Sequence, residues 1–110
     1  MPPTYYSSGN VPHYRSYQIT MTPQGKVLEC WGWMTSKQTF NDNTTYTFNL
    51  PQPYRSTSEM CVTMGYDGHS DCAAMCIWVS GVSSLSVQSQ RYSNGSDSLR
   101  VNYYVRGFVD

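Results

Sequence analysis

The sequence has little charge and no long hydrophobic run. Charged residues make up 13% of its 110 residues, about half the usual share, and the basic residues are scattered. Since a sequence-independent grip on nucleic acid needs clustered Lys and Arg, no nucleic-acid partner is expected. No apolar stretch approaches the roughly 20 residues that span a bilayer, so no membrane insertion is expected. The first residues also lack the basic and apolar regions of a signal peptide.

Cysteine is scarce as well. Four cysteines are too few for a disulfide scaffold of this length. Cys72 and Cys76 on one strand would lie roughly 13 Å apart, too far to bridge. Cys61 could face Cys76 if the chain turns back between them, so the sequence does not decide whether these two cysteines form a disulfide. Buried free thiols are the preferred interpretation.

The motifs of an enzyme are missing too. There is no Gly-x-Ser-x-Gly elbow, and His69 and Asp71 are too close in sequence to build a triad alone. Cys61 could pair with His69, but a thiol within an apolar strand is usually inert. The only glutamates, Glu29 and Glu59, would have to meet at one cleft in a glycosidase, which nothing in the pattern requires. We therefore expect neither catalysis nor a cofactor.

Residues that favour β-strands are abundant, with ten Tyr, three Trp and many Thr, Ser and Val. Six extended segments follow one another between turn residues: Lys26–Trp33, Thr44–Leu50, Glu59–Tyr66, Cys72–Val79, Ser84–Arg91 and Leu99–Phe108. The fourth segment is apolar on both faces, so a second sheet would cover one face and a partner subunit the other. This pattern predicts an all-β, six-stranded antiparallel β-sandwich over residues 25–110.

Residues 1–24 are rich in proline and read as a loosely ordered arm or linker, with a short strand at Tyr17–Met21. This arm would wrap a neighbouring subunit or lead from a preceding domain.

If consecutive strands alternate in direction, the loops after the first, third and fifth strands share one end. These loops are Met34–Asn43, Asp67–Asp71 and Tyr92–Ser98. The chain reaches the first strand from the opposite end, so the loops are predicted to be distal and to meet a target first. Their amides, carboxylates and rings suit sugar hydroxyls, with ordinary solvated turns as the alternative. The predicted ligand-binding residues are Trp33, Lys37, Gln38, Asn41, Asp42, Asn43, Asp67, His69, Asp71, Tyr92, Asn94 and Asp97.

Two features of this set have a structural alternative. The large rings are expected to pack the core or a subunit seam, and Trp33, nearest the distal end, is the best candidate for an exposed platform. The loop from Asp67 to Asp71 could suggest a metal site, with His69 repeated on a trimer axis. Calcium needs more oxygens than this loop supplies, and zinc usually takes ligands from separate elements, so a solvated turn and no metal are expected.

Several short motifs together suggest a family. They are Gly25-Lys-Val-Leu-Glu-Cys-Trp-Gly32, Tyr46-Thr-Phe-Asn-Leu-Pro51, a corner at Pro53 and Tyr54, the apolar run Met60–Met64, Val79-Ser-Gly-Val-Ser-Ser-Leu-Ser-Val87 and the closing Arg106-Gly-Phe108. Over residues 25–109 their order and spacing resemble the C-terminal receptor-binding tip domain of bacteriophage, prophage and tailocin tail fibres. The closing segment, Tyr103–Phe108, departs from the aromatic-apolar stretch common in that family.

The resemblance implies an H-type-lectin-like sandwich that forms a homotrimer, follows a fibre shaft and binds a bacterial surface glycan or protein. It implies a virion protein that is made in the bacterial cytoplasm and acts at the host surface. The sugar site of H-type lectins cannot be placed on this sequence residue by residue. The alternatives are a structural domain that trimerises or caps a virion fibre, and a free-standing H-type lectin.

Overall fold

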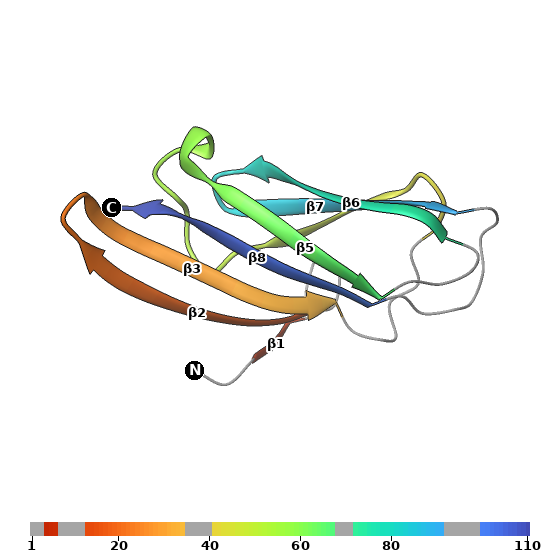
Figure 1. Ribbon diagram of the computed structural model, residues 1–110, viewed down its shortest axis with the longest axis horizontal. Coiled ribbons are helices and arrows are strands. Elements are labelled where there is room, and N and C mark those ends of the chain that lie inside the picture. Colours follow the sequence, from red (N-terminus) through yellow and green to blue (C-terminus); the bar gives the residue numbers. More distant parts are fainter. Residues whose placement is uncertain (1–3, 7–12, 35–40, 68–71, 92–99) are drawn as a thin grey trace.

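The computed structural model describes residues 4–6, 13–34, 41–67, 72–91 and 100–110. The elements are β1 (Thr4–Tyr6), β2 (His13–Thr22), β3 (Gly25–Met34), β4 (Thr45–Asn49), the 3₁₀ turn η1 (Thr57–Glu59), β5 (Cys61–Asp67), β6 (Cys72–Gly81), β7 (Ser84–Arg91) and β8 (Arg100–Val109). A large antiparallel sheet has the order β1-β2-β3-β8-β5, and a small one has the order β4-β7-β6. The two sheets lie one over the other (Figure 1), which confirms the all-β class and agrees with a β-sandwich. No helix in these ranges is long and apolar enough to cross a membrane.

Each of the six predicted segments forms a strand, and the bounds agree within two residues. The strand count is eight rather than six, because the predicted arm contributes β1 and β2. β2 pairs with β3 along its whole length, from His13↔Met34 to Thr22↔Gly25. The short strand expected at Tyr17–Met21 is therefore part of a ten-residue strand, and most of the arm belongs to the large sheet.

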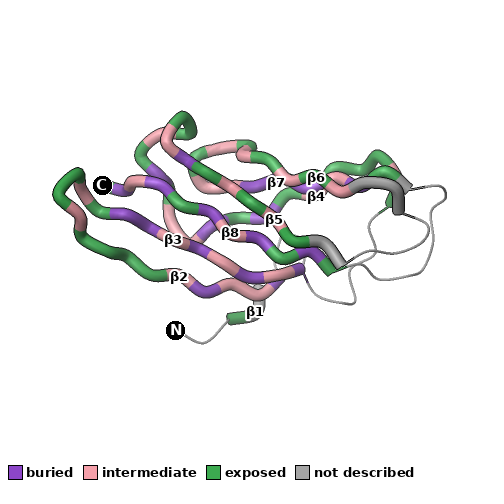
Figure 2. Tube along the Cα trace, viewed as in Figure 1, coloured by how far each residue is buried: buried purple, intermediate pink, exposed green. Residues whose placement is uncertain are grey.

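The core lies between the two sheets and follows the alternation of the strands. Buried positions recur at every second residue along β8 and much of β3 (Figure 2). Phe48 from the small sheet is fully buried, with its ring 5.0 Å from that of His13 and 4.9 Å from that of Tyr103 in the large sheet. Each such buried side chain stabilises the fold by about 1.5–3 kcal/mol.

Tyr54 fastens the loop after β4 to both sheets. Its backbone N–H donates to Val82 O at 2.7 Å, next to the small sheet. Its hydroxyl donates to Leu28 O at 3.1 Å, in the large sheet, and lies 3.5 Å from Cys30 Sγ. Burial first, and then the contact with Cys30, raises the pKa of Tyr54, so the hydroxyl stays protonated. The corner singled out in the sequence is thus a cross-link between the sheets.

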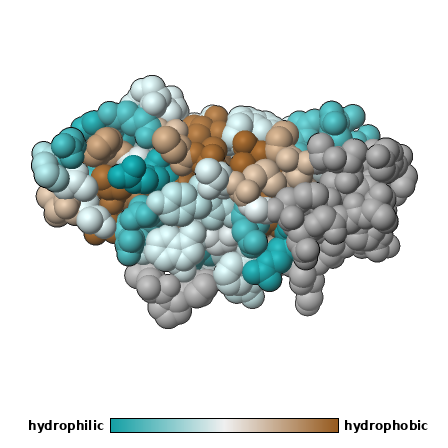
Figure 3. Space-filling view, in the orientation of Figure 1, coloured by the Kyte–Doolittle hydropathy of each residue, from teal (hydrophilic) through white to brown (hydrophobic). Residues whose placement is uncertain are grey.

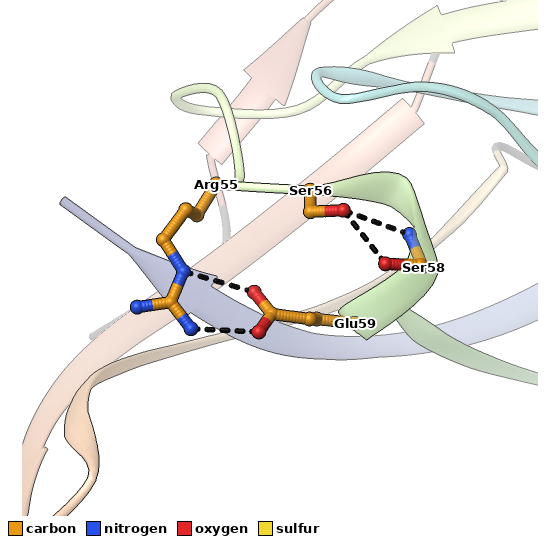
Figure 4. Close-up of polar contacts among 4 residues, drawn as sticks. All are labelled: Arg55, Ser56, Ser58 and Glu59. Carbon is orange, nitrogen blue, oxygen red and sulfur yellow. Dashed lines mark hydrogen bonds and ion pairs between the residues drawn. The ribbon is translucent and has the colours of Figure 1, made fainter.

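The turn that follows is stabilised by polar side chains (Figure 4). Ser56 caps η1 by accepting from Ser58 N, and Arg55 forms a forked pair with Glu59 through Nε–Oε1 at 3.0 Å and Nη2–Oε2 at 2.6 Å. Arg55 N also donates to Phe108 O at 2.8 Å, and the guanidinium lies 5.1 Å from the centre of the Phe108 ring. The turn is therefore tied to the end of β8.

This ion pair gives a pH prediction. The hydrogen bonds from Arg55 hold the pKa of Glu59 below its usual value of 4.5, against a smaller effect of desolvation. Because the folded-state pKa is depressed, the pair stabilises the fold above the usual pKa and ceases to do so as the pH falls through the lower one. We expect Glu59→Gln to lower the Tm slightly at neutral pH and not at all in strong acid, since an exposed pair contributes little. Thermal melts across this range test it, and a Tm difference that does not change with pH would contradict it.

The large sheet is wider than the small one. Three strands cannot cover five, so β2 extends beyond the small sheet. Tyr17 still packs against the core, but Ile19 and Met21, on the same face of β2, remain 47% and 70% exposed. The sandwich is thus open along this side.

The strand ends around the three predicted loops meet at one pole, drawn on the right in Figure 1. Met34, Asp67 and Arg91 end their strands there, as predicted. The chain enters β3 at the opposite pole, at Gly25, as predicted, but it arrives there along β2, which runs antiparallel to β3 and begins at His13, beside Met34. β1 runs antiparallel to β2, so the amino-terminal segment lies along the edge of the large sheet.

Candidate functional site

The structure describes only part of the predicted set of binding residues. Trp33, Asn41, Asp42, Asn43 and the backbone of Asp67 are described. The other members lie outside the described residues: Lys37, Gln38, His69, Asp71, Tyr92, Asn94 and Asp97. The described members form two groups at the pole, one on each sheet.

On the small sheet, the turn before β4 is fixed to β7. Asn43 N donates to Ser89 O at 2.9 Å, and Ser89 Oγ donates to Asn41 O at 3.3 Å. Asn43 has a φ of 53°, a left-handed conformation that asparagine tolerates. Asn41 and Asn43 are exposed, and Asp42 is half-buried. This turn presents two amide side chains on a rigid base.

On the large sheet, Trp33 belongs to a stack rather than forming an open platform. The Tyr14 ring on β2 stacks on its indole at 4.9 Å, and the Arg100 guanidinium on β8 lies 4.9 Å from the indole centre. β2 and β8 flank β3 on opposite sides, so the two contacts reach the indole from both neighbouring strands. Trp33 is therefore already engaged by two side chains.

A second group of side chains lies on the outer face of the large sheet, away from the small sheet. We call this group the Glu29 face. It consists of Gln18 on β2, Glu29 and Trp31 on β3, and Tyr104 and Arg106 on β8. The strand register sets Gln18, Glu29 and Arg106 in one row, and Trp31 beside Tyr104 in the next.

Glu29 is held in place by its neighbours. The Tyr104 hydroxyl donates to its Oε2, and Gln18 Nε2 donates to its Oε1 at 2.9 Å. These two hydrogen bonds, and to a lesser degree the charge of Arg106, lower the pKa of Glu29 against a desolvation effect that raises it. The same bond to Glu29 raises the pKa of Tyr104. The face thus carries a fixed, ionised carboxylate beside a neutral phenol.

Trp31 supplies the open ring of this face. It is half-buried, and within the described residues its indole has no ring or cation contact. Sequence reasoning missed the face because it assigned Trp31 to the core or a seam. The signal was the alternation itself: if Leu28 and Cys30 point inward, Glu29 and Trp31 must point outward.

The outer face of the small sheet has a different character. Trp78 is 37% exposed, and hydrogen bonds link Thr47 Oγ1 to Ser86 Oγ at 2.9 Å and Thr45 Oγ1 to Gln88 Oε1 at 3.1 Å. The described residues that point outward from it carry no charge: Thr45, Thr47, Asn49, Cys76, Trp78, Ser80, Ser84, Ser86, Gln88 and Gln90.

The cysteines differ from expectation at two positions. Cys30 is buried and free, as preferred from the sequence. Cys61 and Cys76 are free but exposed, because they point outward from the large and the small sheet respectively. The expectation of burial is therefore wrong for these two thiols.

Acidic and metal-binding groups stay dispersed where the chain is described. No three His, Cys, Asp or Glu side chains in those ranges come together as a metal site would require. The carboxylate of Glu59 is engaged by Arg55, and that of Glu29 by Tyr104 and Gln18.

The Glu29 face places an aromatic ring, a carboxylate and a guanidinium side by side on one sheet. Such groups bind ligands by stacking and by hydrogen bonds. No family model, curated protein or solved structure matches this chain.

Proposed function

We propose that this protein is the receptor-binding tip domain of a bacteriophage or prophage tail fibre, and that it binds a glycan on the host surface without chemistry. One observation carries the proposal: over the described residues, the outer face of the large sheet combines aromatic rings with hydrogen-bonding side chains, from Glu29 to the stack at Trp33. Sugar hydroxyls need paired donors and acceptors, and the apolar face of a sugar ring needs a flat partner. Such a protein would be made in the bacterial cytoplasm and act in the virion.

A homotrimer is part of the proposal. The outer face of the small sheet lies on the opposite side of the sandwich, carries the exposed Trp78 and is free of charge over its described residues. Uncharged surfaces with an aromatic anchor suit subunit contacts. Three copies would raise a weak affinity through effective concentration. The same observation favours the second candidate, a domain that only trimerises or caps a fibre.

The position of the amino-terminal strands bears on how a shaft would attach. Thr4 pairs with Arg15 and Tyr6 with His13, so β1 lies on the edge of the large sheet and runs toward the loop pole. An upstream shaft would therefore reach the domain along this edge. The loops need not be outermost, which leaves the side of the sandwich as the surface that faces a cell.

Solution mass and binding to cells test the proposal together. We expect a mass near three times the 12.5 kDa of one chain by light scattering, and retention of the labelled protein on bacteria of a susceptible strain. Competition by surface polysaccharide extracted from that strain should release it. A trimer that binds no bacterial surface would support the capping function, and a monomer without binding would contradict both.

A further inference from the structure

We propose that the Glu29 face is the ligand subsite, and that it takes one uncharged pyranose unit stacked on Trp31 with two adjacent hydroxyls on Glu29 and Arg106. This inference deepens the proposed function and rests on it. It moves the site from the polar loops, where the sequence placed it, to the middle of the large sheet.

The first support is the difference in contacts between the indoles of Trp31 and Trp33. Both indoles are half-buried, but that of Trp33 is engaged by Tyr14 and Arg100, whereas that of Trp31 has no ring or cation contact among the described residues. Stacking of a sugar needs a ring that no other ring or cation occupies, and over the described residues Trp31 meets this condition.

The second support is that Glu29 keeps unused acceptors and Arg106 keeps unused donors. An ionised carboxylate has about four acceptor positions, and Tyr104 and Gln18 use one on each oxygen of Glu29. Each oxygen therefore keeps an acceptor position in a fixed direction. Arg106 is exposed and makes no hydrogen bond or ion pair within the described ranges, so its donors are available. A pair of neighbouring hydroxyls can donate to Glu29 and accept from Arg106.

Charge indicates the class of sugar. Glu29 and Arg106 face each other in the strand register and cancel, while the charge of Arg100 is placed over Trp33. A polyanion would meet the carboxylate at the centre of the face, and a polycation would meet the guanidinium. An uncharged hexose or N-acetylhexosamine is repelled neither by the carboxylate nor by the guanidinium.

The same charges argue against a second copy of this chain on the Glu29 face. Subunit contacts are depleted of charged residues at their centre, and here two lie at the centre. In Figure 3, pale and teal atoms lie over the middle of β3 and β8. A subunit contact therefore fits the uncharged small sheet better, and the Glu29 face remains for a hydrophilic ligand.

The experiment uses the whole chain and matched pairs of variants. The first probe is an array of immobilised oligosaccharides that contains neutral hexoses and N-acetylhexosamines together with sialylated, uronate and sulfated members. The strongest neutral binder is then titrated in solution as a free oligosaccharide, which removes avidity. Trp31→Ala is compared with Trp78→Ala, and Glu29→Gln with Glu59→Gln, because Trp78 is the exposed tryptophan of the other sheet and Glu59 the only other glutamate.

We expect Trp31→Ala and Glu29→Gln each to weaken binding by about tenfold or more, and the two controls to stay within about twofold. Perturbation of the Trp31 indole N–H signal in the unmodified protein gives a second readout that does not depend on the folding of a variant. Unchanged binding by both variants, with an unmoved Trp31 signal, would overturn the subsite and leave the function standing. A preference for anionic members would overturn the sugar class, and binding to no member of the array together with no binding to bacteria would overturn the function itself.

Discussion

Replacing Gly32 by alanine is expected to destabilise the fold more than any other single methyl group added to the described sheet. A Cβ built at this position lies 1.9 Å from Tyr14 O and 3.0 Å from Arg15 Cα, which are backbone atoms of β2. Backbone cannot move aside as the end of a side chain can, so β2 and β3 would have to separate locally. We expect a loss of about 3 kcal/mol or more, the upper end of overpacking effects, from a domain whose total stability is about 5–15 kcal/mol.

Gly65 provides the matched control, because it lies on the outer face of β5 and an added Cβ would meet only ordinary contacts with Asn102, at 3.8 Å. Urea unfolding of Gly32→Ala and Gly65→Ala measures the difference directly. We expect Gly65→Ala to keep the midpoint of the parent protein, and Gly32→Ala to lower it strongly or to be insoluble. A Gly32→Ala protein with an unchanged midpoint would show that β2 does not approach β3 as described.

The second large effect is expected at Tyr54. Its ring is buried between the sheets, its hydroxyl donates to Leu28 O, and its Cδ1 lies 2.7 Å from where a Cβ on Gly107 would be. Tyr54→Ala removes the ring and the link, and we expect a loss of about 3–5 kcal/mol, as for other large aromatic truncations. Tyr54→Phe keeps the ring and removes one buried donor, for a loss of about 1–2 kcal/mol.

Tyr104→Phe is the comparison for the hydroxyl, since this side chain lies on the outer face and donates to Glu29, whose charge solvent can also satisfy. We expect the urea midpoints to fall in the order parent, Tyr104→Phe, Tyr54→Phe, Tyr54→Ala. If Tyr54→Phe proves no more costly than Tyr104→Phe, the hydroxyl of Tyr54 does not join the sheets.

Much of the fold follows from local pattern. The alternation of Tyr46, Phe48 and Leu50 fixes β4 and its buried face, and the turn at Gly81 fixes the pairing of β6 with β7. Only half of β2, the short strand at Tyr17–Met21, could be found this way, because prolines surround the strand and its inner face ends in the exposed Ile19 and Met21. A strand that forms mainly because it pairs with a neighbouring strand shows only a weak hydrophobic alternation in its own sequence.

The location of the candidate site was harder to predict than the fold. In β3 both sets of alternate residues are mostly apolar or aromatic, and each holds one charge: Leu28, Cys30 and Met34 with Lys26 on one side, and Val27, Trp31 and Trp33 with Glu29 on the other. Sequence alone does not say which set the small sheet covers, and so it cannot separate a core tryptophan from an exposed one. The path of the amino-terminal segment depended in turn on the full length of β2 and on β1, which the sequence pattern did not indicate.

The two outward thiols affect how the protein must be handled. Cys61 and Cys76 point into solvent from opposite faces of the molecule, so neither can reach the other within one copy. In air they can be oxidised between copies, and these two thiols alone give each chain two linkage points, enough for open-ended covalent chains. Preparations without a reductant would give ladders on a non-reducing gel and inflated masses.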